Sequence, residues 1–178
     1  MLSGREWANR FPTSKSTRDL GPGFRPRIER FISSLESGGA RVRINATTRP
    51  QERAYLMHYA WRIARENLSP DKVPDMPGVD IQWSHTRPDG DIDTLKSRMA
   101  AEQMVQAFEI VFKPALTSKH TEGAAIDMTV TGYLKKSFVN ANQQSVELKS
   151  HSDLHRLGAS FGVHKLVSDP PHWSDDGR

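Results

Sequence analysis

The stretch that decides the fold is TSKHTEGAAIDMTV, residues 117–130. Its second half, AAIDMTV at 124–130, is the best candidate for a central strand, because it is a short and mainly apolar run. A half-buried strand is expected in RVRINAT at 41–47, where Val42 and Ile44 alternate with polar residues. Further short strands are expected in residues 79–83 and 163–167, together with a hairpin in 132–147 and an irregular tail, SDPPHWSDDGR, at the C-terminal end.

Helices are expected between these strands, and the apolar spacing predicts four of them, at about 26–37, 51–67, 92–112 and 150–161. A capping box formed by Thr48 and Gln51 is expected to open the second helix. The third helix is expected to bury one face, which consists of Leu95, Met99, Ala100, Met104, Ala107, Phe108 and Val111. Helices and strands do not alternate strictly. The sequence therefore predicts the α+β class, with a small central antiparallel sheet flanked by helices.

Length and composition indicate an ordinary globular protein. Residues 1–25, rich in Gly, Pro and Ser, are expected to form an extended lead-in, and residues 26–178 a single domain. The absence of Cys excludes disulfides and thiolate chemistry, so any metal must be held by His, Asp or Glu. The sequence does not determine the oligomeric state, and a monomer is the simplest expectation.

Charge and hydropathy exclude two classes of partner. The net charge is +4 and the isoelectric point about 9.5, but no run of five basic residues exists, so nucleic-acid binding is not expected. No apolar run approaches the roughly 20 residues of a membrane span. The first residues, MLSGREWANRFPTSKS, contain no apolar signal region. We therefore expect synthesis in the cytoplasm without a signal peptide.

The segment 117–130 also contains the pattern His120-x-x-Gly123-x-Ala125-x-Asp127. His120 is expected at the lip of the central strand and Asp127 within it. Gly123 allows a tight turn between them, and the small Ala125 leaves room above the sheet. This arrangement can bring an imidazole and a carboxylate to one centre. Taken alone, however, a His and an Asp in this context are more often structural.

A second polar segment, Asp169-Pro-Pro-His172-Trp173, lies near the C-terminal end. Its prolines stiffen the loop and make it a suitable carrier for one metal ligand and one general base. Two His, one carboxylate and an open fourth position form the ligand set of a catalytic zinc site.

Together the segments Ser118-x-His120-x-x-Gly123-x-Ala125-x-Asp127 and Asp169-x-x-His172-Trp173 resemble the paired signature of the zinc D-alanyl-D-alanine carboxypeptidases and L-alanyl-D-glutamate endopeptidases. These peptidoglycan peptidases share a small α+β fold with the Hedgehog signalling domain. The resemblance covers roughly residues 40–175. It implies one Zn²⁺ ion and, as substrate, the stem peptides of the bacterial cell wall.

The resemblance also implies roles for individual residues. His120, Asp127 and His172 hold zinc, Asp169 is the general base and later the acid, and Arg49 binds the scissile carbonyl. Ser118 and Trp173 line or support the site, and His85 is a candidate for the edge of the substrate groove.

Asp169 stands where many carboxypeptidases of this group have Glu, which favours an endolysin-type endopeptidase. The alternatives are a D-alanyl-D-alanine carboxypeptidase and a metal-binding module without activity. Action on the wall would then follow phage-type release or delivery by a secretion system.

Other titratable residues have less informative patterns. His151 and His155 lie four residues apart on an expected helix, but Ser152 stands where a metalloprotease of the His-Glu-x-x-His type carries its Glu. Glu122 is an alternative base within the motif. Arg49 could equally be a surface ion-pair residue, and Trp173 could belong to the core.

Overall fold

The structure, a computed structural model, describes all residues from Met1 to Arg178. The chain divides into two compact units, where the sequence suggested one domain after a lead-in. The first unit, here called the helical unit, comprises Met1–Pro12 and Pro50–Thr117, and the second, the sheet unit, comprises Thr13–Arg49 and Ser118–Arg178. The larger part of the helical unit, residues 50–117, is thus an insertion between the two parts of the sheet unit. Neither unit contains a helix long and apolar enough to cross a membrane.

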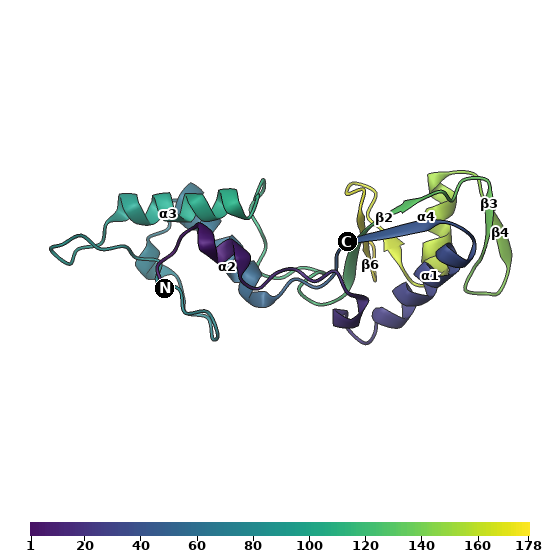
Figure 1. Cartoon of the computed structure of the whole chain (residues 1–178), viewed down its shortest axis with the longest axis horizontal. Coiled ribbons are helices and arrows are strands. Elements are labelled where there is room, and N and C mark those ends of the chain that lie inside the picture. The colour runs from purple at the N-terminus through teal and green to yellow at the C-terminus, as the bar shows by residue number, and fades with distance from the viewer. The chain divides into compact units, whose positions relative to one another are not determined.

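The sheet unit is built on a four-stranded antiparallel sheet with the order β1-β2-β6-β5. Its strands are β1 (Arg41–Ala46), β2 (Ala125–Thr131), β6 (His172–Ser174) and β5 (His164–Lys165). A separate hairpin consists of β3 (Lys136–Val139) and β4 (Ser145–Leu148). The predicted α+β class with a small antiparallel sheet is confirmed, and the stretch 124–130 supplies a strand with a partner on each side (Figure 1).

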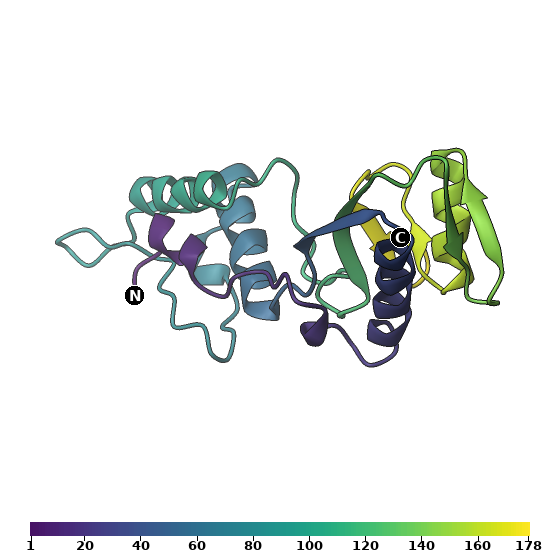
Figure 2. The same cartoon turned by 45° about the vertical axis from the view of Figure 1, so that its right-hand side comes forward.

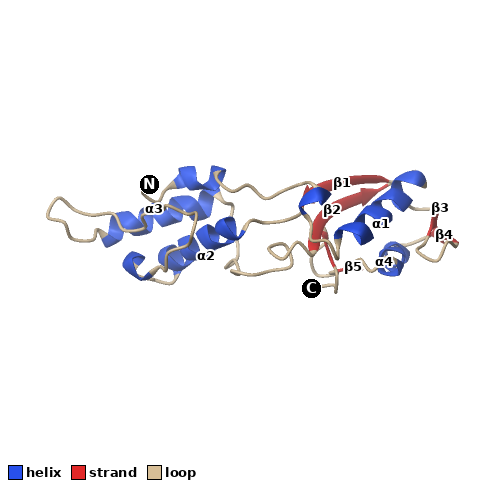
Figure 3. Ribbon diagram, turned by 90° about the horizontal axis from the view of Figure 1, so that it is seen from below, coloured by secondary structure: helices blue, strands red, loops and turns tan.

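Two helices cover one face of this sheet. Helix α1 (Arg25–Ser37) has Pro26 in its first turn, and α4 (His151–Ser160) is capped by the side chain of Ser150, which accepts a hydrogen bond from the backbone of Asp153. Figure 3 shows α1 lying along the strands. Each buried side chain of this size stabilises the fold by roughly 1.5–3 kcal/mol. The core that results contains Ile28, Phe31, Leu35, Ile126, Met128, Leu154, Leu157, Phe161 and Trp173.

In the helical unit, helix α2 (Gln51–Arg65) packs against helix α3 (Thr94–Ala107) (Figure 2). The short helices η1 (Arg5–Asn9) and η3 (Pro70–Lys72) contact α3. The centre of this core is fully buried Trp7, and its other members include Leu56, Ala60, Ile63, Ala101, Met104 and Val105.

Trp7 shows why the lead-in is not simply extended. Residues 5–9 form η1, residues 17–19 form η2 (Thr17–Asp19), and Leu20 and Phe24 are buried in the sheet unit. The capping box is also absent. Thr48 donates its hydroxyl hydrogen to the carbonyl oxygen of Asp19 at 2.6 Å, and α2 begins after Pro50 without a side-chain cap.

The third helix is shorter than expected and buries a different face. It begins after Asp93, whose side chain caps the backbone of Lys96, and it ends at Ala107. The expected buried residues Leu95, Met99, Ala107 and Val111 are exposed, while Ala100, Met104 and Phe108 are buried as expected. The small pair Ala100 and Ala101 allows close approach of a neighbouring helix, so packing and not the largest apolar residues sets the face.

Two strand expectations also differ from the structure. Residues 79–83 form only isolated bridges, between Met76 and Val79 and between Leu2 and Gln82. In the tail, which was expected to be irregular, residues 172–174 form β6 and pair with β2. His172 therefore lies on a strand of the central sheet and not on a free loop.

Candidate metal centre

The paired strands β2 and β6 place Asp127 directly opposite His172 in the antiparallel register. His120 reaches the same point from the turn before β2. That turn needs Gly123, which has a φ of 69°. A Cβ added to Gly123 would also lie 2.7 Å from the backbone nitrogen of Gly21, so any side chain there would collide with the neighbouring segment. The predicted function of this glycine as a tight-turn residue is thus confirmed.

The three side chains converge on one point. The distance from His120 Nε2 to Asp127 Oδ1 is 3.1 Å, from His172 Nδ1 to the same oxygen 3.1 Å, and between the two nitrogens 3.2 Å. Ligands held about 2.0–2.1 Å from a tetrahedral ion are separated by about 3.3 Å, so the triangle has the dimensions of one face of such a site. A fourth, open position completes that tetrahedron. The residues present therefore fit a metal ion of this kind, and no other group of three His, Asp or Glu side chains in the structure does so.

Backbone carbonyls orient both imidazoles. His120 Nδ1 lies 2.6 Å from the carbonyl oxygen of Thr47, and His172 Nε2 lies 3.1 Å from that of Arg178. A carbonyl only accepts, so these two nitrogens carry the hydrogens. In the neutral rings, the lone pairs of His120 Nε2 and His172 Nδ1 then face each other and the carboxylate of Asp127. Three electron-rich atoms at this separation repel one another unless a cation lies between them.

In the metal-free site, protons shared between the imidazoles and Asp127 take the place of that cation. Burial alone would raise the pKa of Asp127, but hydrogen bonds from His120 and His172 hold that pKa well below its ordinary value. The hydrogen bond to Asp127 raises the pKa of His172, although burial partly opposes it. Asp127 is therefore an anion at neutral pH, and metal binding must displace a proton that His172 holds more tightly than usual.

Arg49 lies beside the three ligands. Its backbone N–H donates to the carbonyl oxygen of His120 at 3.0 Å. Its Nε is buried and has no hydrogen-bond partner, and burial lowers the pKa of the guanidinium while the charge of Asp127 raises it. A buried guanidinium nitrogen without a partner is costly unless a ligand supplies an acceptor. Arg49 is thus available to an anionic or carbonyl oxygen at this centre.

Asp169 lies in the loop before His172 and is exposed. Its carboxylate makes no hydrogen bond or ion pair, while its charge contributes to the raised pKa of His172. Its backbone is held firmly: the carbonyl oxygen accepts hydrogen bonds from the N–H of His172 at 3.0 Å and from Lys165 Nζ at 2.5 Å. The result is a free carboxylate on an ordered loop next to a candidate ligand.

The other predicted site residues have different surroundings. Ser118 shapes the turn before β2, since its backbone N–H donates to the hydroxyl of Thr121 at 2.8 Å. Trp173 is almost fully buried in the core against Phe31. His85 belongs to the helical unit, where it is buried and lies 3.1 Å from the hydroxyl of Ser3, so it is not part of the unit that contains the ligands.

Sequence reasoning missed two elements of this site. Lys165 donates to the carbonyl oxygens of Leu166, Asp169 and His172 and so holds the loop that carries the candidate base and a candidate ligand. The carbonyls of Thr47 and Arg178, which orient the imidazoles, were missed as well. No sequence signal marks a backbone carbonyl, because its role depends on which side chain the fold brings to it.

Neither the models of known protein families nor the curated protein sequences gave a match to this chain. The geometry of the site and its motifs are therefore the features that indicate a function.

Proposed function

We propose that this protein is a metal-dependent hydrolase with one ion held by His120, Asp127 and His172. The observation that carries the proposal is the triangle of ligand atoms, 3.1–3.2 Å on each side, with both imidazole lone pairs turned inward by backbone carbonyls. Three protein ligands with an open position are typical of catalytic zinc sites, whereas structural sites close all four positions.

Within that class, we propose a zinc peptidase that cleaves peptide bonds of bacterial peptidoglycan, of the L-alanyl-D-glutamate endopeptidase type. The paired motifs around His120 and His172 support this assignment, as does the α+β sheet unit with its central antiparallel sheet, which is compatible with the Hedgehog and DD-peptidase fold. Asp169 in place of Glu favours the endopeptidase over the carboxypeptidase.

Each residue of the site has its own proposed role in peptide-bond hydrolysis. When bound, zinc supplies Lewis acidity, which lowers the pKa of a coordinated water to about 7. Asp169 accepts the proton of the attacking water and then delivers it to the nitrogen of the leaving amine, so that the C–N bond breaks to an acid and an amine. Arg49 offers its unpartnered Nε to the carbonyl oxygen, where negative charge develops. Thr47 and Arg178 keep the two imidazoles in the required tautomer.

The test combines metal analysis with digestion of the wall. We expect about one zinc per chain, zinc-dependent release of fragments from purified peptidoglycan, and loss of both after chelation. Mass spectrometry of digested muropeptides identifies the bond. Fragments beginning with D-Glu indicate the endopeptidase, and loss of terminal D-Ala indicates the carboxypeptidase. The control is His172→Ala, which should bind zinc weakly. Zinc-loaded protein that releases no fragment from any muropeptide would refute the proposal.

A further inference from the structure

The edge of β2 that faces β6 becomes open a few residues beyond the candidate ligands. Its pairing with β6 ends at Asp127 and His172. The N–H of Met128 still donates to the carbonyl oxygen of Pro171 at 2.9 Å, but a proline has no N–H with which to return the bond. The carbonyl oxygen of Met128 therefore lacks the hydrogen bond that an N–H at position 171 would donate.

The opening continues along the strand. Alternate residues of a strand point their backbone groups to the same side, so the N–H and C=O of Val130 face the same way as those of Met128. No residue of β6 lies opposite Val130 in the register. The sheet thus presents a short row of unpaired backbone groups, a template on which an extended peptide can add as a further strand.

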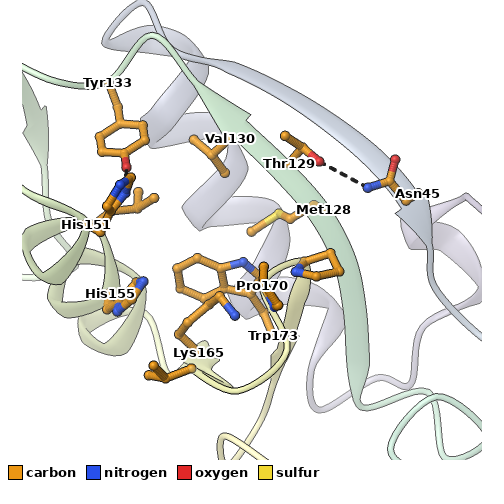
Figure 4. Close-up of a pocket in the computed structure, with 13 residues that line it drawn as sticks. Asn45, Met128, Thr129, Val130, Tyr133, His151, His155, Lys165, Pro170 and Trp173 are labelled. Atoms are coloured by element: carbon orange, nitrogen blue, oxygen red, sulfur yellow. Dashed lines mark hydrogen bonds between the residues drawn. The ribbon is translucent and has the colours of Figure 1, made fainter.

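A cavity of about 700 Å³ opens on this edge (Figure 4). Met128, Val130 and Trp173 supply apolar surface, while Pro170 and Pro171 come from the loop that carries Asp169. Figure 4 shows His151, His155 and Lys165 on one side of the cavity, with Thr129 and Asn45 on the other. The volume lies in the range of ligand sites in proteins.

The cavity is lined by three basic residues, Lys165, His151 and His155, and by no Asp or Glu. His155 makes no hydrogen bond, and its ring packs edge-on against Trp173 with 5.7 Å between the centroids. Burial, and then the charges of Lys165 and His151, lower the pKa of His155, so its ring is neutral at neutral pH and offers an N–H as a hydrogen-bond donor. An anionic group, such as a carboxylate, would complement these residues.

We propose that this cavity binds the stem peptide of the substrate as an added strand on the open edge of β2 at Val130, with a carboxylate of the peptide directed to His155. The inference rests on the proposed function and names the subsite that the function needs. The first fully open residue, Val130, lies three residues beyond Asp127, about 10 Å along the strand, so a peptide on this edge lies within a few residues of the candidate ligands.

The backbone part of the proposal is tested with Val130→Pro. This substitution removes an N–H that faces the cavity and leaves the bonds to β1 in place, since proline is tolerated where no ladder bond is lost. The matched control is Val130→Ala, which retains the N–H. Calorimetry with metal-depleted protein and a synthetic stem peptide should show binding weakened about 3- to 10-fold by Val130→Pro, the value of one hydrogen bond, and less by Val130→Ala.

The charge part is tested with His155→Phe, which preserves the edge-on ring contact and removes both nitrogens. Wild-type protein should prefer the stem peptide to an analogue with amidated carboxylates. His155→Phe should lose that preference, and His155→Gln, which keeps a donor, should retain part of it. The His155→Phe variant also keeps the proposal testable if Val130→Pro fails to fold.

The outcomes separate this inference from the proposed function. Protein that cleaves peptidoglycan but whose peptide affinity and KM are unchanged in folded Val130→Pro, or in His155→Phe, overturns the inference and leaves the function intact. Protein that cleaves no muropeptide, yet binds the stem peptide with the expected losses in both variants, overturns the function and supports the cavity as a peptide site. Protein that neither cleaves nor binds overturns both.

Discussion

Replacement of Asp169 by Asn separates the proposed base from the metal ligands. The carboxylate of Asp169 is exposed and makes no hydrogen bond or ion pair, and the contacts that hold its loop come from the backbone. Asp169→Asn should therefore change the free energy of unfolding by no more than about 0.5 kcal/mol. Zinc content should also stay near one ion per chain, because the three ligands are untouched.

Turnover should behave differently. A positioned general base contributes about 10²–10⁴-fold, and each tenfold change corresponds to about 1.36 kcal/mol, so Asp169→Asn should raise the activation barrier by roughly 2.7–5.4 kcal/mol. The assay is steady-state release of muropeptide fragments, with zinc measured by mass spectrometry and stability by urea unfolding on the same samples.

Glu122→Gln is the matched control, since Glu122 is an exposed acid within the ligand motif. It should keep near-normal kcat. Near-normal turnover in Asp169→Asn together with a large loss in Glu122→Gln would move the base to Glu122. Loss of zinc in Asp169→Asn would make Asp169 a ligand. Either result would refute the assignment.

Three further predictions concern the ligands, the loop and the core. Because its pKa is raised, His172 in metal-free protein adds stability that is complete below about pH 6.5 and is lost as the pH rises through the raised pKa. Zinc affinity should instead fall as the pH drops through that pKa, because the protonated imidazole cannot bind the ion. Thermal unfolding and zinc titration across about pH 5–8 should show these opposite trends. Lys165→Met should release the loop from three carbonyl contacts and lower kcat by about 10²-fold while KM changes little, which steady-state kinetics would show; an unchanged kcat would mean that the loop is ordered without Lys165. Gly158→Ala should destabilise the sheet unit by roughly 1–3 kcal/mol, because its Cβ would lie 2.7 Å from Trp173 Cζ3 and 2.9 Å from the carbonyl oxygen of Val163; an unchanged Tm would contradict that packing.

Much of the fold could be predicted because local pattern and tertiary contact agree. The apolar run at 124–130 became the central strand β2, and Pro26 and Ser150 began their helices where the sequence indicated. Prediction failed where packing chose between similar apolar faces. Leu95 and Met99 are large and regularly spaced, yet α3 buries the smaller Ala100 and Ala101.

The division into two units could not be predicted from composition either. Trp7 lies far in sequence from α3, but its side chain completes the core of the helical unit. Its burial depends on a surface that exists only after the insertion has folded. The same reason explains why the segment after Pro171 was expected to be irregular. Three residues are a weak local signal for a strand, and β6 forms because β2 offers it a pairing edge.

The sequence by itself determined which side chains are available for chemistry: without Cys, only His, Asp and Glu can hold a metal, and the spacing of His120, Gly123 and Asp127 indicated one turn and one strand. The paired motifs also implied that His172 joins them, but only the tertiary structure decided how it does so, since 45 residues separate it from Asp127 and the β2–β6 register brings the two side by side. The orientation of the imidazoles, the contacts of Lys165 and the open edge of β2 were likewise decided by the fold. Each depends on backbone N–H and C=O groups. Every residue except proline carries the same pair of groups, so the sequence does not show which of them will contact a given side chain in the folded chain.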